Sequence, residues 1–487
     1  MPRGVHAPGT GGGHAFTFGG ARYAFDPVSG ALHRLSAPAY TAVRLVAARG
    51  WDGARAGRGG RDEQTAHRAR LLQSLDELAQ LQAAGALFTA DPAPGVGPAA
   101  GASSGAGVAR DPGAGRMLRA LCLNVAHDCN MACDYCFSGD GAYGGGRALM
   151  PPDVAERAID LLFDCAGGPA CEVDFFGGEP LLNLEAVAAA VARGRQRARE
   201  RGMRVAFTLT TNALLLRGEA AGFVDAEMDN VVLSCDGRPV VHDRHRRRRA
   251  GGPTHAAVLE NVLDFAARRG ARDYWVRGTY TRQNLDFDAD ALYLVDRGLP
   301  HVSVEPIVAP RRTPLALRRA DMPAVRRAYA RLAAAVIERR RAGRAFEFFH
   351  FRFDRDRGAC LERRAAGCGA GRDYLAVDPS GRLWPCHQFV GRPGFELGDV
   401  RAGIAASPVR AAFCALGVAA KPACRQCWAR YLCGGGCHAA AHLASGDLLT
   451  PDPVACAVQR ARLEAALHVA ADTRVAAAPH GSTTQRL

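Results

Sequence analysis

Strand-like and helix-like segments alternate from residue 118 to about residue 345, and this alternation restricts the fold more than any other feature. Six apolar segments are predicted strands: 119–125, 172–176, 204–210, 230–234, 273–280 and 301–307. Helical stretches lie between them: 151–165, 183–200, 254–269 and 321–341. Six β/α units predict an α/β fold with either a parallel sheet or a partial (β/α)6 barrel. Ligands of such folds bind at the carboxyl ends of the strands.

Three cysteines follow the first predicted strand directly, in the run AHDCNMACDYCF. Cys129, Cys133 and Cys136 have the spacing Cys-x3-Cys-x2-Cys, and no fourth cysteine follows nearby. A four-iron cluster usually takes four thiolates, so three would leave one iron open to another ligand. The alternative is zinc, although zinc sites favour cysteine pairs and close at four ligands. The spacing favours an iron–sulfur cluster, and the position after the strand places it at the barrel mouth.

Polar residues and glycines also follow the later strands. Gly177, Gly178, Glu179 and Pro180 come after the second strand, where glycines let the backbone approach a ligand closely. The other candidates at strand ends are Thr210, Thr211, Asn212, Ser234, Arg246 and residues 304–307. Each alone is compatible with ordinary turn chemistry. Their joint placement at successive strand ends predicts a ligand site.

A second set of cysteines lies toward the C-terminal end: Cys360, Cys368, Cys386, Cys424, Cys427, Cys433, Cys437 and Cys456. Eight thiols are enough for two further four-thiolate clusters, with two structural zinc sites as the alternative. The glycines between Cys433 and Cys437 permit a tight bend whose N–H groups can donate to cluster sulfurs. The remaining cysteines are predicted to be small buried hydrophobes: Cys122, Cys165, Cys171, Cys235 and Cys414.

The net charge of +14 does not by itself indicate nucleic-acid binding. All but one of the 62 basic residues are arginine, Lys421 being the single lysine, which indicates a compositional bias. The densest basic run, 244–249, lacks the interleaved aromatics of a nucleic-acid surface. No apolar run approaches the length of a membrane span, and the N-terminus lacks the apolar core of a signal peptide. We therefore expect a cytoplasmic protein that binds neither nucleic acid nor membrane.

The first 90 residues predict a small separate module. Residues 14–35 alternate in a strand-like way around a turn, a helix is expected near 37–48, and a Gly/Arg-rich insertion covers 50–63. A stripe of leucines at 71, 75, 78 and 81 predicts a second helix. Gly85 is expected to cap that helix, and Leu87 and Phe88 to return as a strand. Residues 91–115, almost entirely Gly, Ala, Pro and Ser, predict a flexible linker.

In combination these motifs resemble radical S-adenosylmethionine (SAM) enzymes with a C-terminal extension of the SPASM type, over about residues 118–460. The runs ALCLNVAHDCNMACDYCF, EVDFFGGEPLLN, FTLTTN and GCGAGRDYLAVDPSGRLWPCHQFVG resemble the maturases of SCIFF peptides, which are short cysteine-rich ribosomal peptides. The start, HAFTFGGARYAFDPVSGALHRLS, resembles their winged-helix-like leader-peptide recognition module. The 50–63 insertion and the long linker depart from that compact pattern. The resemblance implies a recognition module (14–90), linker (91–115), radical SAM partial barrel (116–345), SPASM domain (346–465) and flexible tail (466–487).

The resemblance also implies three [4Fe-4S] clusters and SAM as cofactors. Cys129, Cys133 and Cys136 would hold the cluster that binds SAM. Two auxiliary clusters would be held by Cys360, Cys368, Cys386 and Cys437, and by Cys424, Cys427, Cys433 and Cys456. If Cys360 is not a ligand, the first auxiliary cluster has an open iron. Gly177 to Pro180 would hold the methionine amino group, Asn212, Ser234 and Arg246 the ribose and carboxylate, and 304–307 the adenine. For His387, a packed surface histidine is favoured over a role near the cluster.

The implied activity is a radical reaction on a peptide. SAM would be cleaved to a 5′-deoxyadenosyl radical, and a cysteine thioether to threonine would be installed in a cysteine-rich precursor peptide that carries a leader. A low-potential donor such as ferredoxin or flavodoxin would supply electrons. The alternatives are maturation of an anaerobic sulfatase to formylglycine, cross-linking of a quinohemoprotein amine dehydrogenase subunit, and a zinc protein that binds nucleic acid without catalysis.

Overall fold

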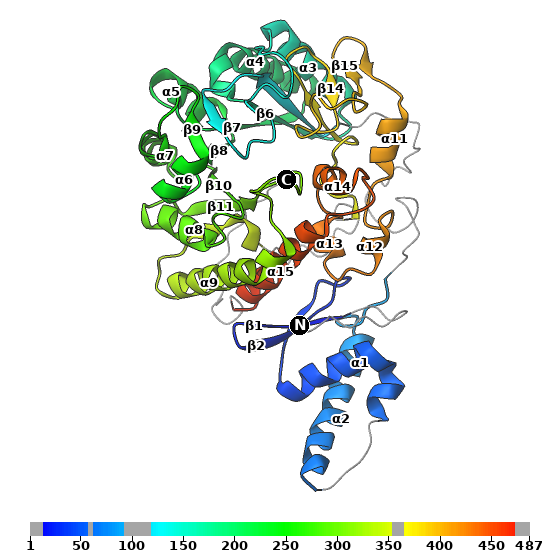
Figure 1. Ribbon diagram of the computed structural model, residues 1–487. Coiled ribbons are helices and arrows are strands. Elements are labelled where there is room, and N and C mark those ends of the chain that lie inside the picture. Colours follow the sequence, from blue (N-terminus) through cyan, green and yellow to red (C-terminus); the bar gives the residue numbers. More distant parts are fainter. Residues whose placement is uncertain (1–12, 57–61, 92–117, 353–364, 473–487) are drawn as a thin grey trace.

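A computed structural model describes residues 13–56, 62–91, 118–352 and 365–472 (Figure 1). Apart from Asp91, the predicted linker over 91–115 lies outside the described residues, and so does Cys360. The described part contains a small N-terminal unit, a large sheet with helices, and a C-terminal region of short elements that ends in one long helix.

The six predicted strands are present and are adjacent in one sheet. They are β4 (Ala120–Ala126), β6 (Ala170–Gly177), β7 (Arg204–Thr211), β8 (Asn230–Ser234), β10 (Tyr274–Tyr280) and β11 (His301–Pro306). Every neighbouring pair among them is parallel. Because all these strands run the same way, their carboxyl ends lie at one edge. This confirms the predicted α/β fold with a sheet dominated by parallel strands.

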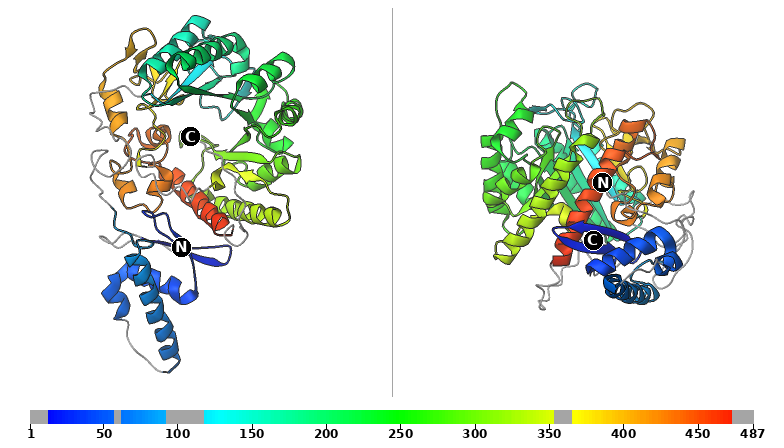
Figure 2. Two further views of the ribbon diagram at one scale, coloured as in Figure 1. Left: turned by 180° about the vertical axis from the view of Figure 1, so that it is seen from behind. Right: turned by 60° about the horizontal axis from the view of Figure 1, so that its bottom comes forward.

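The helices cover the outer face of the curved sheet (Figures 1 and 2). The four predicted helices are α3 (Pro152–Cys165), α4 (Leu184–Arg201), α7 (His255–Arg269) and α9 (Met322–Arg341). Three shorter ones are α5 (Gly218–Glu227), α6 (Pro239–His245) and α8 (Phe287–Asp296). Strand β6 alternates between buried and half-buried residues, with Val173 and Phe175 fully buried. One face of the sheet therefore packs on the helices, while the inner face keeps partly accessible side chains.

The sheet extends beyond the predicted barrel at both edges. Strand β12 (Glu347–Phe348) pairs with β11, and β13 (Tyr374–Val377) pairs in parallel with β4. Strand β14 (Leu383–Trp384) follows β13 as an antiparallel neighbour. These strands of two to four residues are too short to show a periodic pattern in the sequence. Segments from the C-terminal third of the chain thus form both edges of the main sheet.

The C-terminal helix α15 (Pro453–Asp472) packs along α9. Leu463, Ala466 and Val469 are among its buried residues. The prediction of a flexible tail from residue 466 is therefore wrong for residues 466–472. These residues are helical because the buried apolar face of α15 continues through them. Residues 473–487 lie outside the described part of the chain.

The N-terminal unit combines a three-stranded antiparallel sheet with two helices. Its elements are β1 (His14–Phe18), β2 (Ala21–Phe25), β3 (Leu32–Leu35), α1 (Ala37–Arg55) and α2 (Asp62–Ala83). Gly85 has a φ of 66° just after α2, as expected of a capping glycine. The predicted strand at Leu87 and Phe88 is wrong. The φ of Phe88 is 53°, which is incompatible with extended backbone, and both side chains instead fill the core beside α1 and α2.

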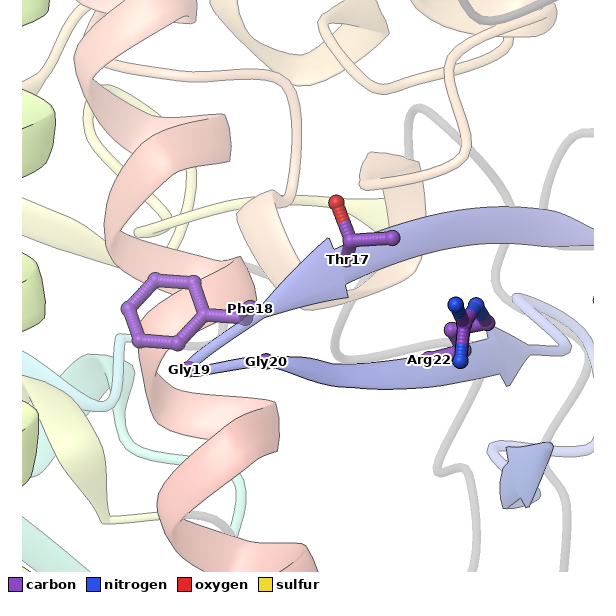
Figure 3. Close-up of a pocket in the computed structure, with 5 residues that line it drawn as sticks. All are labelled: Thr17, Phe18, Gly19, Gly20 and Arg22. Atoms are coloured by element: carbon purple, nitrogen blue, oxygen red, sulfur yellow. The ribbon is translucent and has the colours of Figure 1, made fainter. Parts of the chain in front are cut away.

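This unit packs against the C-terminal region rather than standing apart. Phe16, Tyr23 and Phe25 share one buried cluster with Trp428 and with Leu463 and Leu467 of α15. In the middle of β2, the Tyr23 hydroxyl lies 2.8 Å from Nδ1 of His468 on α15. Figure 3 shows Gly19 and Gly20 beside that helix, where Thr17, Phe18 and Arg22 also line a shallow hollow of about 300 Å³. A Cβ on Gly19 would lie 2.8 Å from the His468 ring, so the tip requires glycine.

Candidate active site at the strand ends

The cysteine triplet forms a loop that leaves β4 and returns toward α3. Sγ of Cys129 accepts a hydrogen bond from the N–H of Met131 at 3.4 Å, and Sγ of Cys136 lies 2.9 Å from the Ser138 hydroxyl. Cys133 ends the short strand β5 (Met131–Cys133), which pairs with β9 (Arg246–Arg248) and sets Cys133 opposite Arg246. The pairing explains how a run of arginines far along the chain shapes the cysteine loop.

The three thiols lie within electrostatic range of one another. Burial raises the pKa of Cys129 to about 11 and the pKa of Cys133 to about 12, and in each case the Cys136 thiol adds to the rise. Thiols in this setting ionise only with a strong counter-charge, which a metal centre supplies. Among the described residues, no three histidine, cysteine, aspartate or glutamate side chains are gathered closely enough to hold a single metal ion. The three thiols therefore fit a site whose ligands ionise when a metal centre binds, and in a four-iron cluster each thiolate binds a different iron.

A series of hydrogen bonds connects the cysteine loop to strand β10. Arg246 donates to the Tyr135 hydroxyl at 2.8 Å, and Tyr135 donates to a carboxylate oxygen of Asp236 at 2.6 Å. The other Asp236 oxygen accepts the N–H of Thr279 on β10 at 3.0 Å. Arg246 was predicted to contact SAM, and the structure brings it to the triplet. Part of its guanidinium holds Tyr135, while its buried Nε has no hydrogen-bond partner among the described residues.

The glycines after β6 lock that strand end onto the triplet loop. The N–H of Gly178 donates to the Ala126 carbonyl at 2.7 Å, and the N–H of Glu179 donates to the Asp128 carbonyl at 2.9 Å. A Cβ on Gly178 would lie 2.1 Å from the Asp128 oxygen, and one on Gly177 would lie 2.4 Å from the Ala126 oxygen. Only glycine permits this approach, since real Cβ atoms do not come so close. The predicted approach of this backbone to a ligand stays a prediction, since the close contacts here are with the Ala126 and Asp128 carbonyls.

The carboxylate of Glu179 is fully buried and joins two strand ends. It accepts the Thr211 hydroxyl and the Asn212 N–H, each at 2.7 Å, and the Leu181 N–H at 3.1 Å. Burial raises the pKa of Glu179 to about 7, against the effect of these hydrogen bonds. The carboxylate thus turns inward, which leaves the backbone of residues 177–179 facing the loop.

Asn212 connects this cluster to the triplet. Its Nδ2 donates to the Asn130 side chain at 2.7 Å and lies 3.6 Å from Sγ of Cys129. Ser234 ends β8 in register with Arg277 of β10, further along the same edge of the sheet. The structure thus brings Asn212 and Arg246 to the cysteine loop directly, and it places Ser234 on a neighbouring strand end.

A charged group that the sequence did not reveal lies at the end of β11, where residues 304–307 were predicted to line adenine. Glu305 pairs with Nε2 of His350 at 3.0 Å, and Arg462 of α15 approaches both residues. Although burial acts to raise it, His350 and then Arg277 and Arg462 hold the pKa of Glu305 below its usual range. No local motif marks His350 or Arg462, because only the packing of α15 brings them here.

The C-terminal cysteines separate into two groups in space. The pKa of Cys386 is raised to about 12 by burial and further by Cys437 and Cys368. The pKa of Cys424 is raised to about 11 by burial, and Cys456, Cys433 and Cys427 add to that rise. The described members of the two expected ligand sets are therefore neighbours within each set.

Backbone N–H groups point at several of these sulfurs. Cys433 accepts from Gly436 and Gly435, and Cys386 accepts from Gln388 and Phe389. Such bonds favour thiolate and tune a bound cluster, so the donor sets fit iron–sulfur centres. Of the five other cysteines, Cys122, Cys165, Cys171 and Cys235 are buried as predicted. The same prediction for Cys414 is wrong, since its position on a short helix faces solvent.

His387 connects the first auxiliary group to the triplet. Its ring centroid lies 5.3 Å from that of Phe137, which follows Cys136, and 5.0 Å from that of Phe176 at the end of β6. Burial lowers the pKa of His387 to about 4, with Arg277 as a second cause. His387 is half-buried and its ring packs against these two aromatic rings, in agreement with the packed histidine that the sequence favoured.

Comparison with known proteins identifies the central part of the chain. Residues 123–279 match the model of the Radical SAM superfamily. The chain is 30% identical to GTP 3′,8-cyclase 2 of Mycobacterium bovis over 232 residues, which is 40% of this chain and 61% of that relative. It is 27% identical to a serine-type anaerobic sulfatase-maturating enzyme of Bacteroides thetaiotaomicron over 138 residues, 28% of this chain and 33% of the relative. The chain thus spans less than two thirds of either relative.

The fold is similar to that of anSMEcpe solved with bound AdoMet, with a TM-score of 0.61 at 18% identity. The match covers 74% of this chain and 99% of that one. The same protein with AdoMet and the Kp18Cys peptide gives a TM-score of 0.61 at 19% identity. In the part of the chain that the structure describes, no helix combines the length and apolarity required to cross a bilayer.

Proposed function

Because residues 123–279 match the model of the Radical SAM superfamily, we propose that this chain is a peptide-modifying radical SAM enzyme that installs a cysteine thioether, to threonine, in a ribosomally made, cysteine-rich precursor peptide. Cys129, Cys133 and Cys136 would hold the cluster that binds SAM. When bound, that cluster supplies the electron that cleaves SAM to methionine and a 5′-deoxyadenosyl radical. The protein's own part is to hold the cofactor, exclude water and position the peptide.

The observation that carries this proposal is the contact between the two cysteine regions through Phe137 and His387. This contact supports an arrangement in which the SAM site and the first auxiliary cysteine set border the same space. A peptide bound next to SAM would then also lie near the first auxiliary cysteines. In a thioether step, the radical removes a hydrogen atom from a peptide carbon and the cysteine thiol gives up its proton. The carbon–sulfur bond then forms, and one electron must leave. Clusters at the auxiliary cysteines would accept that electron and pass it on.

Contacts to SAM are assigned to residues at the strand ends. The backbone of Gly177, Gly178 and Glu179, with Pro180, would hold the methionine amino group. Asn212, Ser234 and Arg246 would contact ribose and carboxylate, and residues 304–307 the adenine. The contacts of Asn212 and Arg246 with the triplet loop support this assignment. Cys360, Cys368, Cys386 and Cys437 would ligate the first auxiliary cluster, and Cys424, Cys427, Cys433 and Cys456 the second.

The N-terminal unit is proposed to bind the leader of the precursor peptide. Its three-stranded sheet ends in β1 on one side and β3 on the other, so each outer strand has an edge to which an extended peptide can add. A low-potential ferredoxin or flavodoxin would be the electron donor. The sheet packs on Trp428, next to Cys427, which supports a leader site close to the auxiliary region.

Sulfatase maturation to formylglycine is a second candidate function. It is supported by the 27% identity, over 138 residues, with the serine-type anaerobic sulfatase-maturating enzyme of Bacteroides thetaiotaomicron. Cross-linking of a quinohemoprotein amine dehydrogenase subunit uses the same radical chemistry on another substrate. The peptide product therefore decides among these functions.

The test is mass spectrometry of a cysteine-rich precursor peptide after anaerobic incubation with reconstituted enzyme, SAM and dithionite. We expect loss of two hydrogen atoms per event and one cysteine that no longer reacts with iodoacetamide. The triple variant Cys129→Ala/Cys133→Ala/Cys136→Ala should produce no 5′-deoxyadenosine, whereas Cys414→Ala, an exposed cysteine outside both sets, should act as wild type.

Two outcomes would contradict the thioether proposal. Release of 5′-deoxyadenosine with an unchanged peptide mass would support radical cleavage of SAM but would show that this peptide is not the substrate. A hydrazide-reactive aldehyde formed on a sulfatase-derived peptide, with no change in the cysteine-rich peptide, would establish the second candidate.

A further inference from the structure

Lys421 is the single lysine of a chain with 62 basic residues, and it is fully buried. A lysine side chain is rarely fully buried unless its ammonium group is paired with other polar or charged groups. Here the residue precedes the four-residue helix α12 (Pro422–Arg425), which carries Cys424. The chain uses arginine at every other basic position, so the lysine at this buried position calls for a physical explanation.

The Lys421 ammonium is bonded to the glycine loop between Cys433 and Cys437. Nζ donates to the Gly435 carbonyl at 2.8 Å and lies 3.2 Å from Nδ1 of His438. Gly435 has a φ of +91°, and its Cα faces the lysine side chain, whose Cδ would lie 3.6 Å from an added Cβ. The lysine thus fixes the carbonyl orientation of a loop whose N–H groups donate to the Cys433 sulfur.

The same ammonium interacts with thiols of both auxiliary sets. Burial lowers the pKa of Lys421, and four cysteines act against that fall, Cys424 and Cys433 of the second set and Cys437 and Cys368 of the first. Of the arginines nearby, Arg462 acts on Cys433 and Arg460 on Cys456, so each acts on one auxiliary thiol, and Arg462 also acts on Glu305. A compact ammonium bonds to one carbonyl and one imidazole in a space that the larger, planar guanidinium fork would not match.

We propose that Lys421 is a positioning residue that holds the Cys433–Cys437 loop and sets the reduction potentials of the clusters bound by the two auxiliary cysteine sets. This rests on the proposed function, in which those sets carry iron–sulfur clusters. A cluster becomes more negative on reduction, and a buried cation stabilises the more negative state because the surrounding medium screens charge poorly. Lys421 therefore makes both auxiliary centres better acceptors of the electron that leaves the peptide.

The experiment is an EPR-monitored redox titration, with iron analysis, of full-length protein carrying Cys129→Ala/Cys133→Ala/Cys136→Ala, so that only auxiliary clusters give a signal. Lys421→Gln keeps a donor for Gly435 but removes the charge, whereas Lys421→Met removes both. Lys421→Arg keeps the charge. Arg425→Gln is the matched control, because it removes a cation from the same helix α12 at an exposed position.

We expect Lys421→Gln to retain the iron of the parent protein and to shift the potentials to more negative values. Lys421→Met should shift them similarly and lose iron faster to a chelator, and Lys421→Arg should stay closer to the parent than Lys421→Gln. Parent-like potentials in both Lys421→Gln and Lys421→Met would overturn the proposal, as would an equal shift in Arg425→Gln. If the parent triple variant itself assembles no clusters, the proposal that the C-terminal cysteines bind clusters is wrong, and the Lys421 proposal fails with it. If clusters assemble but their potentials do not depend on Lys421, only the Lys421 proposal fails.

Discussion

The imidazole ring of His14 lies flat against the indole of Trp428, with ring centroids 3.9 Å apart and planes inclined by 2°. His14 begins the first strand of the N-terminal sheet, and Trp428 directly follows Cys427 of the second auxiliary set. Asp91, at the end of the described N-terminal unit, pairs with Arg430 at 2.8 Å two residues further on. The sheet proposed to bind a leader therefore contacts the cysteine-bearing segment with no intervening element.

Trp428→Ala should loosen this contact. Removing a buried aromatic side chain typically lowers the free energy of unfolding by about 3–5 kcal/mol, and Trp428 is only 4% exposed. Hydrogen exchange should become faster over residues 14–35 and over helix α15. Phe349→Ala is the matched control, since Phe349 is 45% exposed and its loss should change stability by less than about 0.5 kcal/mol. Unchanged exchange in Trp428→Ala would show that the interface does not depend on this ring.

Gly178→Ala should disable the cofactor site. The new methyl group would lie 2.1 Å from the Asp128 carbonyl, so the loop that carries Cys129 must move. Displacement of catalytic groups by about 1 Å reduces rates on the order of 100-fold, and we expect at least that loss in 5′-deoxyadenosine formation. Gly222→Ala has open space around its Cβ and should leave the rate unchanged. Wild-type activity in Gly178→Ala would contradict the assigned loop geometry.

Glu179 should make stability depend on pH. Burial raises its pKa to about 7, so the folded state binds a proton that the unfolded state, with a pKa near 4.5, releases. Stability contributed by this group is therefore present at low pH and falls as pH rises from about 4.5 to about 7, by roughly 3 kcal/mol.

The measurement is urea unfolding of cluster-free protein at several pH values between 4.5 and 8. Glu179→Gln should remove this part of the slope, because the amide does not titrate. Glu185→Gln, at an exposed position on α4, should keep the wild-type slope. Parallel pH profiles for wild type and Glu179→Gln would mean that the carboxyl ionises equally in both states.

Tyr135→Phe should weaken the support of the cysteine loop. The change removes the hydroxyl that joins Arg246 to Asp236 at 2.8 Å and 2.6 Å. Loss of such a bond next to buried polar groups costs about 1–3 kcal/mol, and iron at the triplet should be lost faster to a chelator. Tyr40→Phe, on helix α1 of the N-terminal unit, is the control. Equal rates of iron loss in the two variants would exclude a supporting role for the Tyr135 hydroxyl.

The parallel strands and the helices between them could be predicted because each is a long segment with a clear apolar pattern. Strands β13 and β14 could not, since they have four and two residues and depend on pairing with β4 far along the chain. Phe88 has strand-like neighbours in the sequence, but the turn after Gly85 directs it into the core. Local periodicity therefore identified the elements of the sheet but not its edges.

The candidate site shows a similar division. Spacing identified the cysteines and the glycine motif, since both are contiguous in the chain. It did not show that the Glu179 carboxylate turns inward to Thr211 and Asn212, because that requires the ends of two strands to meet. Nor did composition show that the single lysine is buried, since burial of Lys421 depends on folding of the glycine loop over it.

The pairing of β13 with β4 has a consequence for the order of folding. Ala120 and Tyr374 are partners, although more than 250 positions separate them in the chain. During synthesis the strand that leads into Cys129 therefore keeps an unpaired edge until the C-terminal third has emerged, and such an edge can pair with another chain. Sheet pairings this distant in sequence form slowly. Of the six predicted strands, the one that carries the candidate cofactor loop is consequently the last to gain both neighbours, and a chain truncated before Tyr374 would expose it to aggregation.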